Sequence, residues 1–185
     1  MICENLLKSL SSKLSRRRLL RLAAALPLLS KSTAVMAAQQ SDKAAATQQR
    51  ALSRIAFGSC AHQDKDQPIW SDIMGSQPEL FVFLGDNIYG DSDNPEVLAA
   101  KYAKLAAKPG FSSLRQQIEV IATWDDHDYG RNDAGREYPS KEASRKLLLD
   151  FFGEPARSER RTRPDGIYTS YLYGASGQKV QVILL

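Results

Sequence analysis

The stretch Glu79-Leu80-Phe81-Val82-Phe83-Leu84-Gly85-Asp86 (residues 79–86) decides the fold class of this chain. Its apolar run is almost continuous and ends at a glycine and a carboxylate. A run of this kind is typical of a strand buried on both faces, as in parallel sheets covered by helices. We therefore expect a central strand at residues 79–84, with Asp86 just beyond its carboxyl end.

Strand and helix patterns alternate on either side of this segment. We expect strands at residues 54–57, 79–84 and 117–123, helices at 69–74, 96–108 and 140–152, and two last strands at 168–173 and 179–185. Asn94-Pro95 should begin the second helix and Pro109-Gly110 should stop it, and Ser140 is the candidate cap of the third. Parallel neighbours need crossover connections, so this order predicts an α/β fold with a parallel-type sheet flanked by helices.

The N-terminal 38 residues have the build of an export signal. A basic segment at residues 15–21 precedes an apolar run at 22–29 that is too short to span a bilayer. Arg16 and Arg17 are placed as in a twin-arginine signal, with a cleavage site near Ala37. The alternative is a basic amphipathic helix of a cytosolic protein. We expect a removed signal peptide at 1–38, a linker at 39–53 and a domain at 54–185, exported to the periplasm or outside the cell.

Export changes the meaning of the charge and of the cysteines. The formal charge of +4 does not indicate nucleic-acid binding, because much of the excess lies in the predicted signal. Of the two cysteines, Cys3 would leave with the signal, so the mature chain would keep Cys60 alone. A lone thiol in an oxidising compartment needs an explanation other than an internal disulfide.

Three predicted strands end in side chains that bind metals. They are followed, in chain order, by Ser59-Cys60, by Asp86-Asn87-Ile88-Tyr89 and by Asp125-Asp126-His127-Asp128. Two unit charges about 4 Å apart repel by roughly 4 kcal/mol at an effective dielectric constant near 20, so the carboxylates need neutralising. Protonation and basic partners such as Arg131 and Arg136 are alternatives. A divalent or trivalent metal fits best, because the other two strand ends add a thiol that would lose its proton beside a cation, a carboxylate, an amide and a phenol.

Each of these residues also has a purely structural interpretation. Cys60 could be an inert buried thiol, Asp86 a turn or cap residue, Tyr89 a core residue, and His127 the donor of a structural hydrogen bond. Further along the chain, we expect loop, capping and solvent-facing roles for the following residues: His62 in a loop, Asp91 and Asp93 as caps of the next helix, and Lys101, Lys104 and Lys108 on its solvated face. The metal hypothesis rests on the coincidence of three strand ends.

The three motifs together resemble the PhoD-like alkaline phosphatases, a branch of the calcineurin-like metallophosphatase superfamily. The motifs are Phe57-Gly58-Ser59-Cys60, residues 83–91 (FLGDNIYGD) and residues 124–130 (WDDHDYG) followed by Asn132-Asp133. The resemblance covers residues 54–185 and implies a layered metallophosphatase fold. It also implies an exported enzyme that hydrolyses phosphate esters, and it agrees with the twin-arginine signal.

The resemblance implies a role for individual residues. Cys60 and Tyr89 would bind a ferric ion, Asp86 would bridge the metals, Asp126 would be a further ligand, and His127 would contact the phosphate and protonate the leaving group. It also implies calcium, for which carboxylate oxygens are suitable ligands, while other divalent metals remain possible. Five residues have less definite roles around the site, orienting the ligands or facing the substrate: Asn87, Asp125, Asp128, Arg131 and Asn132.

The sequence ends at Leu185 within an expected strand, and the resemblance implies later His and Asp ligands that this sequence does not contain. We therefore expect the fold to be incomplete at its C-terminus, as a fragment or a natural truncation, with weak activity. The main alternative is a non-catalytic metal-binding remnant of the same fold. An esterase is disfavoured, because there is no Gly-x-Ser-x-Gly elbow.

Overall fold

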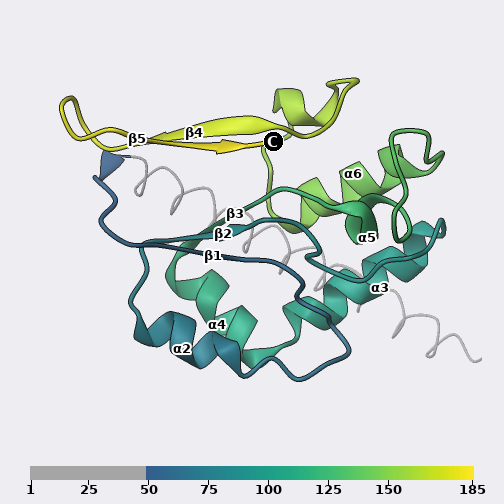
Figure 1. Ribbon diagram of the computed structural model, residues 1–185, viewed down its shortest axis with the longest axis horizontal. Coiled ribbons are helices and arrows are strands. Elements are labelled where there is room, and N and C mark those ends of the chain that lie inside the picture. Colours follow the sequence, from purple (N-terminus) through teal and green to yellow (C-terminus); the bar gives the residue numbers. More distant parts are fainter. Residues whose placement is uncertain (1–48) are drawn as a thin grey trace, which may run out of the picture. The chain divides into compact units, whose positions relative to one another are not determined.

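The computed structural model describes residues 49–185, and the predicted signal peptide and most of the predicted linker lie outside this range. Three strands, β1 (Ile55–Gly58), β2 (Leu80–Phe83) and β3 (Glu119–Ala122), form a parallel sheet in the order β1-β2-β3. Helices α2 (Ile69–Gly75), α3 (Pro95–Ala106) and α4 (Pro109–Gln117) provide the crossovers (Figure 1). The predicted α/β class, with a parallel sheet flanked by helices, is confirmed.

After β3 the chain forms α5 (Asp126–Tyr129), α6 (Lys141–Phe151) and a 3₁₀ turn at Glu159–Arg161. The hairpin of β4 (Thr169–Tyr173) and β5 (Val180–Leu184) follows as an antiparallel two-stranded sheet. The two predicted last strands are therefore confirmed, and they form a second sheet. Within residues 49–185, no helix combines the length and the apolar character that a membrane crossing requires.

The central strand β2 is buried on both faces, as its sequence predicts. Phe81 and Phe83 face a core built with the helices, in which Trp70, Phe111 and Phe152 surround them. Leu80 and Val82 point to the opposite face and pack in a second core with the hairpin residues Tyr173 and Leu184. The alternation of side chains along a strand thus places β2 between a helical layer and the hairpin.

A buried arginine connects the hairpin to the end of β3. Arg160 is 3% exposed and donates hydrogen bonds to the carbonyl oxygens of Ala122 and Ile167, both at 2.7 Å. Its guanidinium also pairs with Glu154 at 2.8 Å and donates to the Tyr171 hydroxyl at 3.2 Å. The charge is compensated and its donors are used, which is the condition for burying an arginine.

The second helix ends at Ala106, before Pro109-Gly110, as predicted, but the sequence interpretation missed a further helix that begins there. Pro109 is the first residue of α4, because proline fits the first helical turn where no N–H partner is needed. Consequently residue 117 is helical, and β3 is shorter than the expected strand at residues 117–123. Ser140 occupies the N-cap position of α6, but its side chain makes no capping hydrogen bond.

Candidate metal centre

The carboxyl ends of the three parallel strands meet at one edge of the sheet. The loops that follow them are joined by backbone hydrogen bonds: Leu84 N–H donates to Gly58 O at 2.9 Å, and Ala61 N–H donates to Asp86 O at 2.9 Å. On the other side, Thr123 N–H donates to Phe83 O at 3.0 Å. The strand-end residues chosen from the sequence therefore lie on neighbouring loops.

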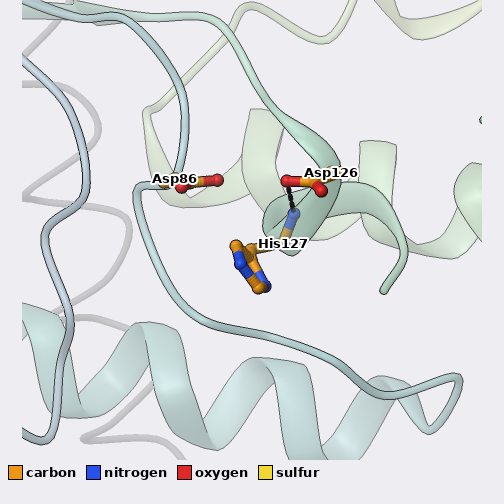
Figure 2. Close-up of side chains that lie close together, drawn as sticks. All are labelled: Asp86, Asp126 and His127. Atoms are coloured by element: carbon orange, nitrogen blue, oxygen red, sulfur yellow. Dashed lines mark hydrogen bonds between the residues drawn. The ribbon is translucent and has the colours of Figure 1, made fainter. Parts of the chain in front are cut away.

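Asp86, Asp126 and His127 form the centre of this edge. One potential ligand atom from each of the three lies within 4.8 Å of the others. Figure 2 shows the two carboxylates turned toward each other from separate loops, with the imidazole beside the gap between them. Asp86 follows β2, whereas Asp126 and His127 begin α5 after β3. The spacing leaves room for a small cation between them, and the residues come from the segments that follow β2 and β3.

Asp86 is held in an environment that does not satisfy its charge. Within the described residues, its Oδ1 atom is buried and has no hydrogen-bond partner. Burial raises the pKa of Asp86, and the nearby carboxylates of Asp125 and Asp126 act in the same direction, against the opposing effects of His127 and the Cys60 thiol. A buried carboxylate oxygen without a donor is costly, so Oδ1 is suited to a cation.

Cys60 and Tyr89 lie beside Asp86. The Cys60 thiol is exposed, which excludes the inert buried thiol, and it donates to Asp86 Oδ2 at 3.6 Å. Burial raises the pKa of Tyr89 to about 12, with further contributions from Cys60 and Asp86. The Tyr89 ring lies between two imidazoles, stacked on His62 at 4.5 Å and tilted against His127 at 4.3 Å. Cys60 therefore contacts Asp86 and Tyr89 contacts His127, but among the described residues the cluster of potential ligand atoms within 4.8 Å of one another contains Asp86, Asp126 and His127 and not Cys60.

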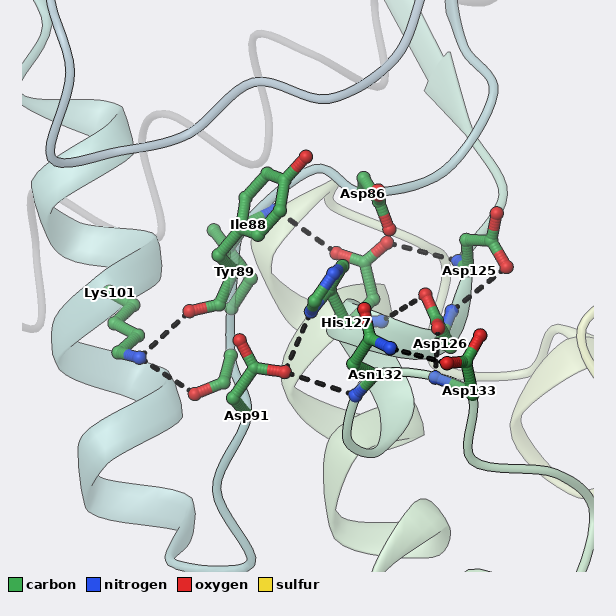
Figure 3. Close-up of polar contacts among 12 residues, drawn as sticks. Asp86, Ile88, Tyr89, Asp91, Lys101, Asp125, Asp126, His127, Asn132 and Asp133 are labelled. Atoms are coloured by element: carbon green, nitrogen blue, oxygen red, sulfur yellow. Dashed lines mark hydrogen bonds and ion pairs between the residues drawn. The ribbon is translucent and has the colours of Figure 1, made fainter.

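Asp91 orients His127, a role that the sequence interpretation missed. The expectation was that Asp91 caps the next helix, but Asn94 caps α3, and its side chain accepts the Glu96 N–H at 2.8 Å. Asp91 Oδ1 instead lies 2.6 Å from His127 Nδ1 and accepts the Asn132 N–H (Figure 3). The signal available in the sequence was a second carboxylate five residues after Asp86.

The protonation of His127 reflects these neighbours. Burial lowers the pKa of the imidazole, but the Asp91 hydrogen bond and the negative charges of Asp91, Asp86 and Asp126 outweigh it, so the pKa is raised. With Nδ1 bonded to Asp91, Nε2 is the nitrogen left to face a ligand. The raised pKa favours the protonated imidazole relative to an ordinary histidine.

Asp128 holds together the two loops that carry the cluster. Its side chain is 1% exposed and accepts the backbone N–H groups of Asn87, Ile88 and Asp125, each at 3.1 Å. It also accepts the Asn87 side-chain amide at 2.9 Å. Burial raises the pKa of Asp128 to about 7 against the lowering effect of these donors. Asp125 is the N-cap of α5 and closes a capping box with Asp128.

Two glycines allow the two loops to approach this closely. Gly85 has a φ of +112°, and a Cβ on it would lie 2.6 Å from the Cβ of Asp125. A Cβ on Gly90 would lie 2.5 Å from the backbone oxygen of His127, which accepts the Gly90 N–H at 2.8 Å. A side chain at either position would push the loop carrying Asp86 away from the loop carrying His127.

The backbone is also strained at this edge. Among the described residues, five that are not glycine have a positive φ, and four of these lie around the cluster: Cys60, Asp86, Asp91 and Asp133. Such conformations cost energy and gather at functional sites. The strain is consistent with loops whose conformation is set by the positions of metal-ligand side chains.

Several polar residues near the cluster tie loops together. Arg131 pairs with Asp93 at 3.3 Å, and both side chains are more than 60% exposed, so Asp93 does not cap the helix. The expected solvated face of α3 is confirmed for Lys104, whose side chain is 57% exposed, but not for Lys101. Lys101 donates to the carbonyl oxygens of Tyr89 and Gly90, both at 2.7 Å (Figure 3). Lys104 and Lys108 likewise bond to the loop after β1.

Comparison with known proteins supports the fold alone. No protein-family model matches the chain, and no curated protein sequence matches it significantly. Among solved structures, one described as "Structure of PhoD" matches with a TM-score of 0.58 and 16% sequence identity over 69% of this chain. The match spans 30% of that structure's chain. The fold described here is therefore similar to part of that structure.

Proposed function

We propose that this chain belongs to a metal-dependent phosphatase or phosphodiesterase that hydrolyses phosphate esters, as the PhoD-like resemblance implies. The observation that carries the proposal is the cluster of Asp86, Asp126 and His127, in which a buried carboxylate oxygen of Asp86 lacks a partner within the described residues. The similarity to the PhoD structure supports the proposal at the level of the fold.

The donor atoms fit hard and intermediate metal ions. Carboxylates of Asp86 and Asp126 suit calcium or another divalent ion, and the Cys60 thiol with the Tyr89 phenol would suit ferric iron once deprotonated. A bound metal would polarise the phosphoryl oxygens and lower the pKa of a coordinated water. We assign Cys60, Asp86, Tyr89 and Asp126 as the ligands.

The remaining residues position groups or move a proton. His127 would contact the phosphate and donate its Nε2 proton to the leaving oxygen, while Asp91 holds the ring through Nδ1. Asn87, Asp125 and Asp128 would maintain the distance between the two ligand loops. Asn132 and Arg131 would order the outer loop, since Asn132 N–H bonds to Asp91 and Arg131 pairs with Asp93.

The proposal includes export. Residues 1–38 would be a twin-arginine-type signal recognised by that export machinery, and residues 54–185 the partial metallophosphatase domain. This pathway carries folded proteins, so the metal could be loaded before export. The end of the predicted linker is docked on the domain, because Glu79 accepts the N–H groups of Ser53 and Arg54.

The test begins with the metal. The full chain should retain iron or a divalent metal by elemental analysis, Asp86→Ala should abolish this uptake, and Cys60→Ser should selectively weaken iron. Asp165→Ala, at an exposed carboxylate far along the chain, is the matched control and should retain the metal. If both site variants keep full metal content, the ligand assignment is wrong.

Turnover is tested separately. In a metal-loaded chain that hydrolyses a phosphate ester, His127→Ala should cut the rate by a factor of about 10²–10⁴ and leave the metal in place. Asp91→Asn should cause a smaller loss and shift the pH profile, because Asp91 acts through His127. Metal uptake without any hydrolysis would favour the alternative, a non-catalytic metal-binding remnant of the fold.

A further inference from the structure

A pocket opens between the loop after β1 and helix α2, next to the candidate metal centre. Its volume is about 490 Å³, within the range of pockets that bind small organic ligands. Aromatic and aliphatic side chains make up the larger part of the wall: Phe57, Ile69, Trp70, Ile73, Phe81 and Phe83. The polar part of the lining includes Ser59, Lys65, Asp66 and Gln67. The indole N–H of Trp70 is already bonded to Gln67 Oε1 at 2.7 Å, so this wall presents hydrocarbon to the pocket.

The pocket and the metal centre share residues. Cys60 lines the pocket, and its sulfur lies 3.6 Å from Asp86 Oδ2. His62 also lines the pocket, and its ring stacks on Tyr89, which in turn contacts His127. A molecule whose phosphate was held by a metal on Asp86, beside His127, would therefore extend past Cys60 into the pocket.

We propose that this pocket binds the alcohol part of the phosphate ester, and that this part is apolar, an aryl or alkyl group. The proposal rests on the proposed function of the same site. A hydroxyl-rich alcohol such as glycerol would lose its hydrogen bonds to water against this wall, whereas an apolar group gains from burial. The wall is partly open, since Ile69 is 53% and Phe57 70% exposed, and a bound hydrocarbon would cover both.

The test compares two phosphonates that cannot be hydrolysed, methylphosphonate and octylphosphonate, by calorimetry on the metal-loaded full chain. Both have the same head group, so the ratio of their affinities reports the pocket. We expect octylphosphonate to bind at least about tenfold more tightly. Ile69→Trp should fill the pocket and bring the ratio toward one, and Phe57→Ala should reduce it severalfold. Both positions are exposed, so neither variant should prevent folding.

Val97→Trp is the matched control, because Val97 is an exposed aliphatic residue on α3 and is not part of the pocket wall. It should keep the wild-type ratio. Two outcomes would overturn the pocket assignment and leave the proposed function standing. One is that the wild type binds both phosphonates with equal affinity, and the other is that the affinity ratio is unchanged in both Ile69→Trp and Phe57→Ala. If methylphosphonate binds equally with and without metal and in Asp86→Ala, the proposed function fails, and the ester assignment fails with it.

Discussion

Carboxylates lie at both ends of the parallel sheet, and their surroundings are opposite. At the amino end of β2, Glu79 accepts hydrogen bonds from the backbone of Ser53 and Arg54 and from the Ser53 hydroxyl, and it pairs with Arg50. These bonds, led by the one from Ser53, lower the pKa of Glu79 to about 2 against the effect of burial. At the carboxyl end, burial raises the pKa of Asp86, and one of its oxygens has no partner within residues 49–185.

The difference separates a carboxylate whose charge the fold compensates from one whose charge it leaves poorly compensated. The protein supplies Glu79 with enough donors to compensate its charge. This side chain therefore stabilises the segment before β1 against the start of β2. Asp86 receives a thiol donor and two further carboxylates as neighbours, so its charge is left for something else to compensate. A metal site requires negative charge that the protein does not compensate and that its loops hold in a fixed position in the metal-free state.

The largest effect should come from breaking the frame at the carboxyl end. Asp128→Ala would leave the buried N–H groups of Asn87, Ile88 and Asp125 without an acceptor, and we expect it to lower the free energy of unfolding by about 3–5 kcal/mol. Urea denaturation measures this. Asp93→Ala removes an exposed ion pair and should cost less than about 1 kcal/mol. Equal losses in the two variants would refute the role of Asp128.

A smaller effect is expected at the amino end. Glu79→Gln weakens bonds made to a carboxylate and should cost about 1–2 kcal/mol at pH 7. The folded-state pKa of about 2 lies below the ordinary value of 4.5, so the wild type should lose this stability as the pH falls from about 4.5 to 2. The variant should not show this loss. Asp72→Asn, on the exposed side of α2, should follow the wild type, and parallel profiles in all three proteins would contradict the account.

The smallest effect should have the opposite sign. Asp86→Asn removes a poorly compensated negative charge, so the metal-free protein should gain about 0.5–1 kcal/mol of stability. Added metal should raise the melting temperature of the wild type and leave that of Asp86→Asn unchanged. The reason is that a ligand stabilises only a protein whose folded state binds it. A variant that is less stable than the wild type without metal would mean that Asp86 makes a structural bond.

Local pattern was sufficient to predict the sheet and the residues at its edge. The apolar run of β2, the glycine after it and the alternation with helices all depend on neighbours in the sequence, and the predicted class is confirmed. The chain brings Asp86, Asp126 and His127 together because parallel strands align their ends. The presence of a metal there stays a prediction.

What the sequence interpretation missed depends on contacts between distant segments. Asp91 reaches His127 across 36 positions, and Lys101 reaches carbonyl oxygens of the preceding loop, so local capping and solvation rules assigned both wrongly. The start of α4 at Pro109 was missed for a different reason, because proline and glycine both stop and start helices. The burial of Asp128 likewise becomes evident only when the two loops meet.

The most direct test of the central claim is anomalous diffraction from crystals of the metal-loaded chain. The account predicts a peak that the carboxylates of Asp86 and Asp126 both contact at about 2.0–2.6 Å. A structure with no peak at this edge of the sheet, in which a protein donor satisfies the Asp86 carboxylate instead, would contradict it.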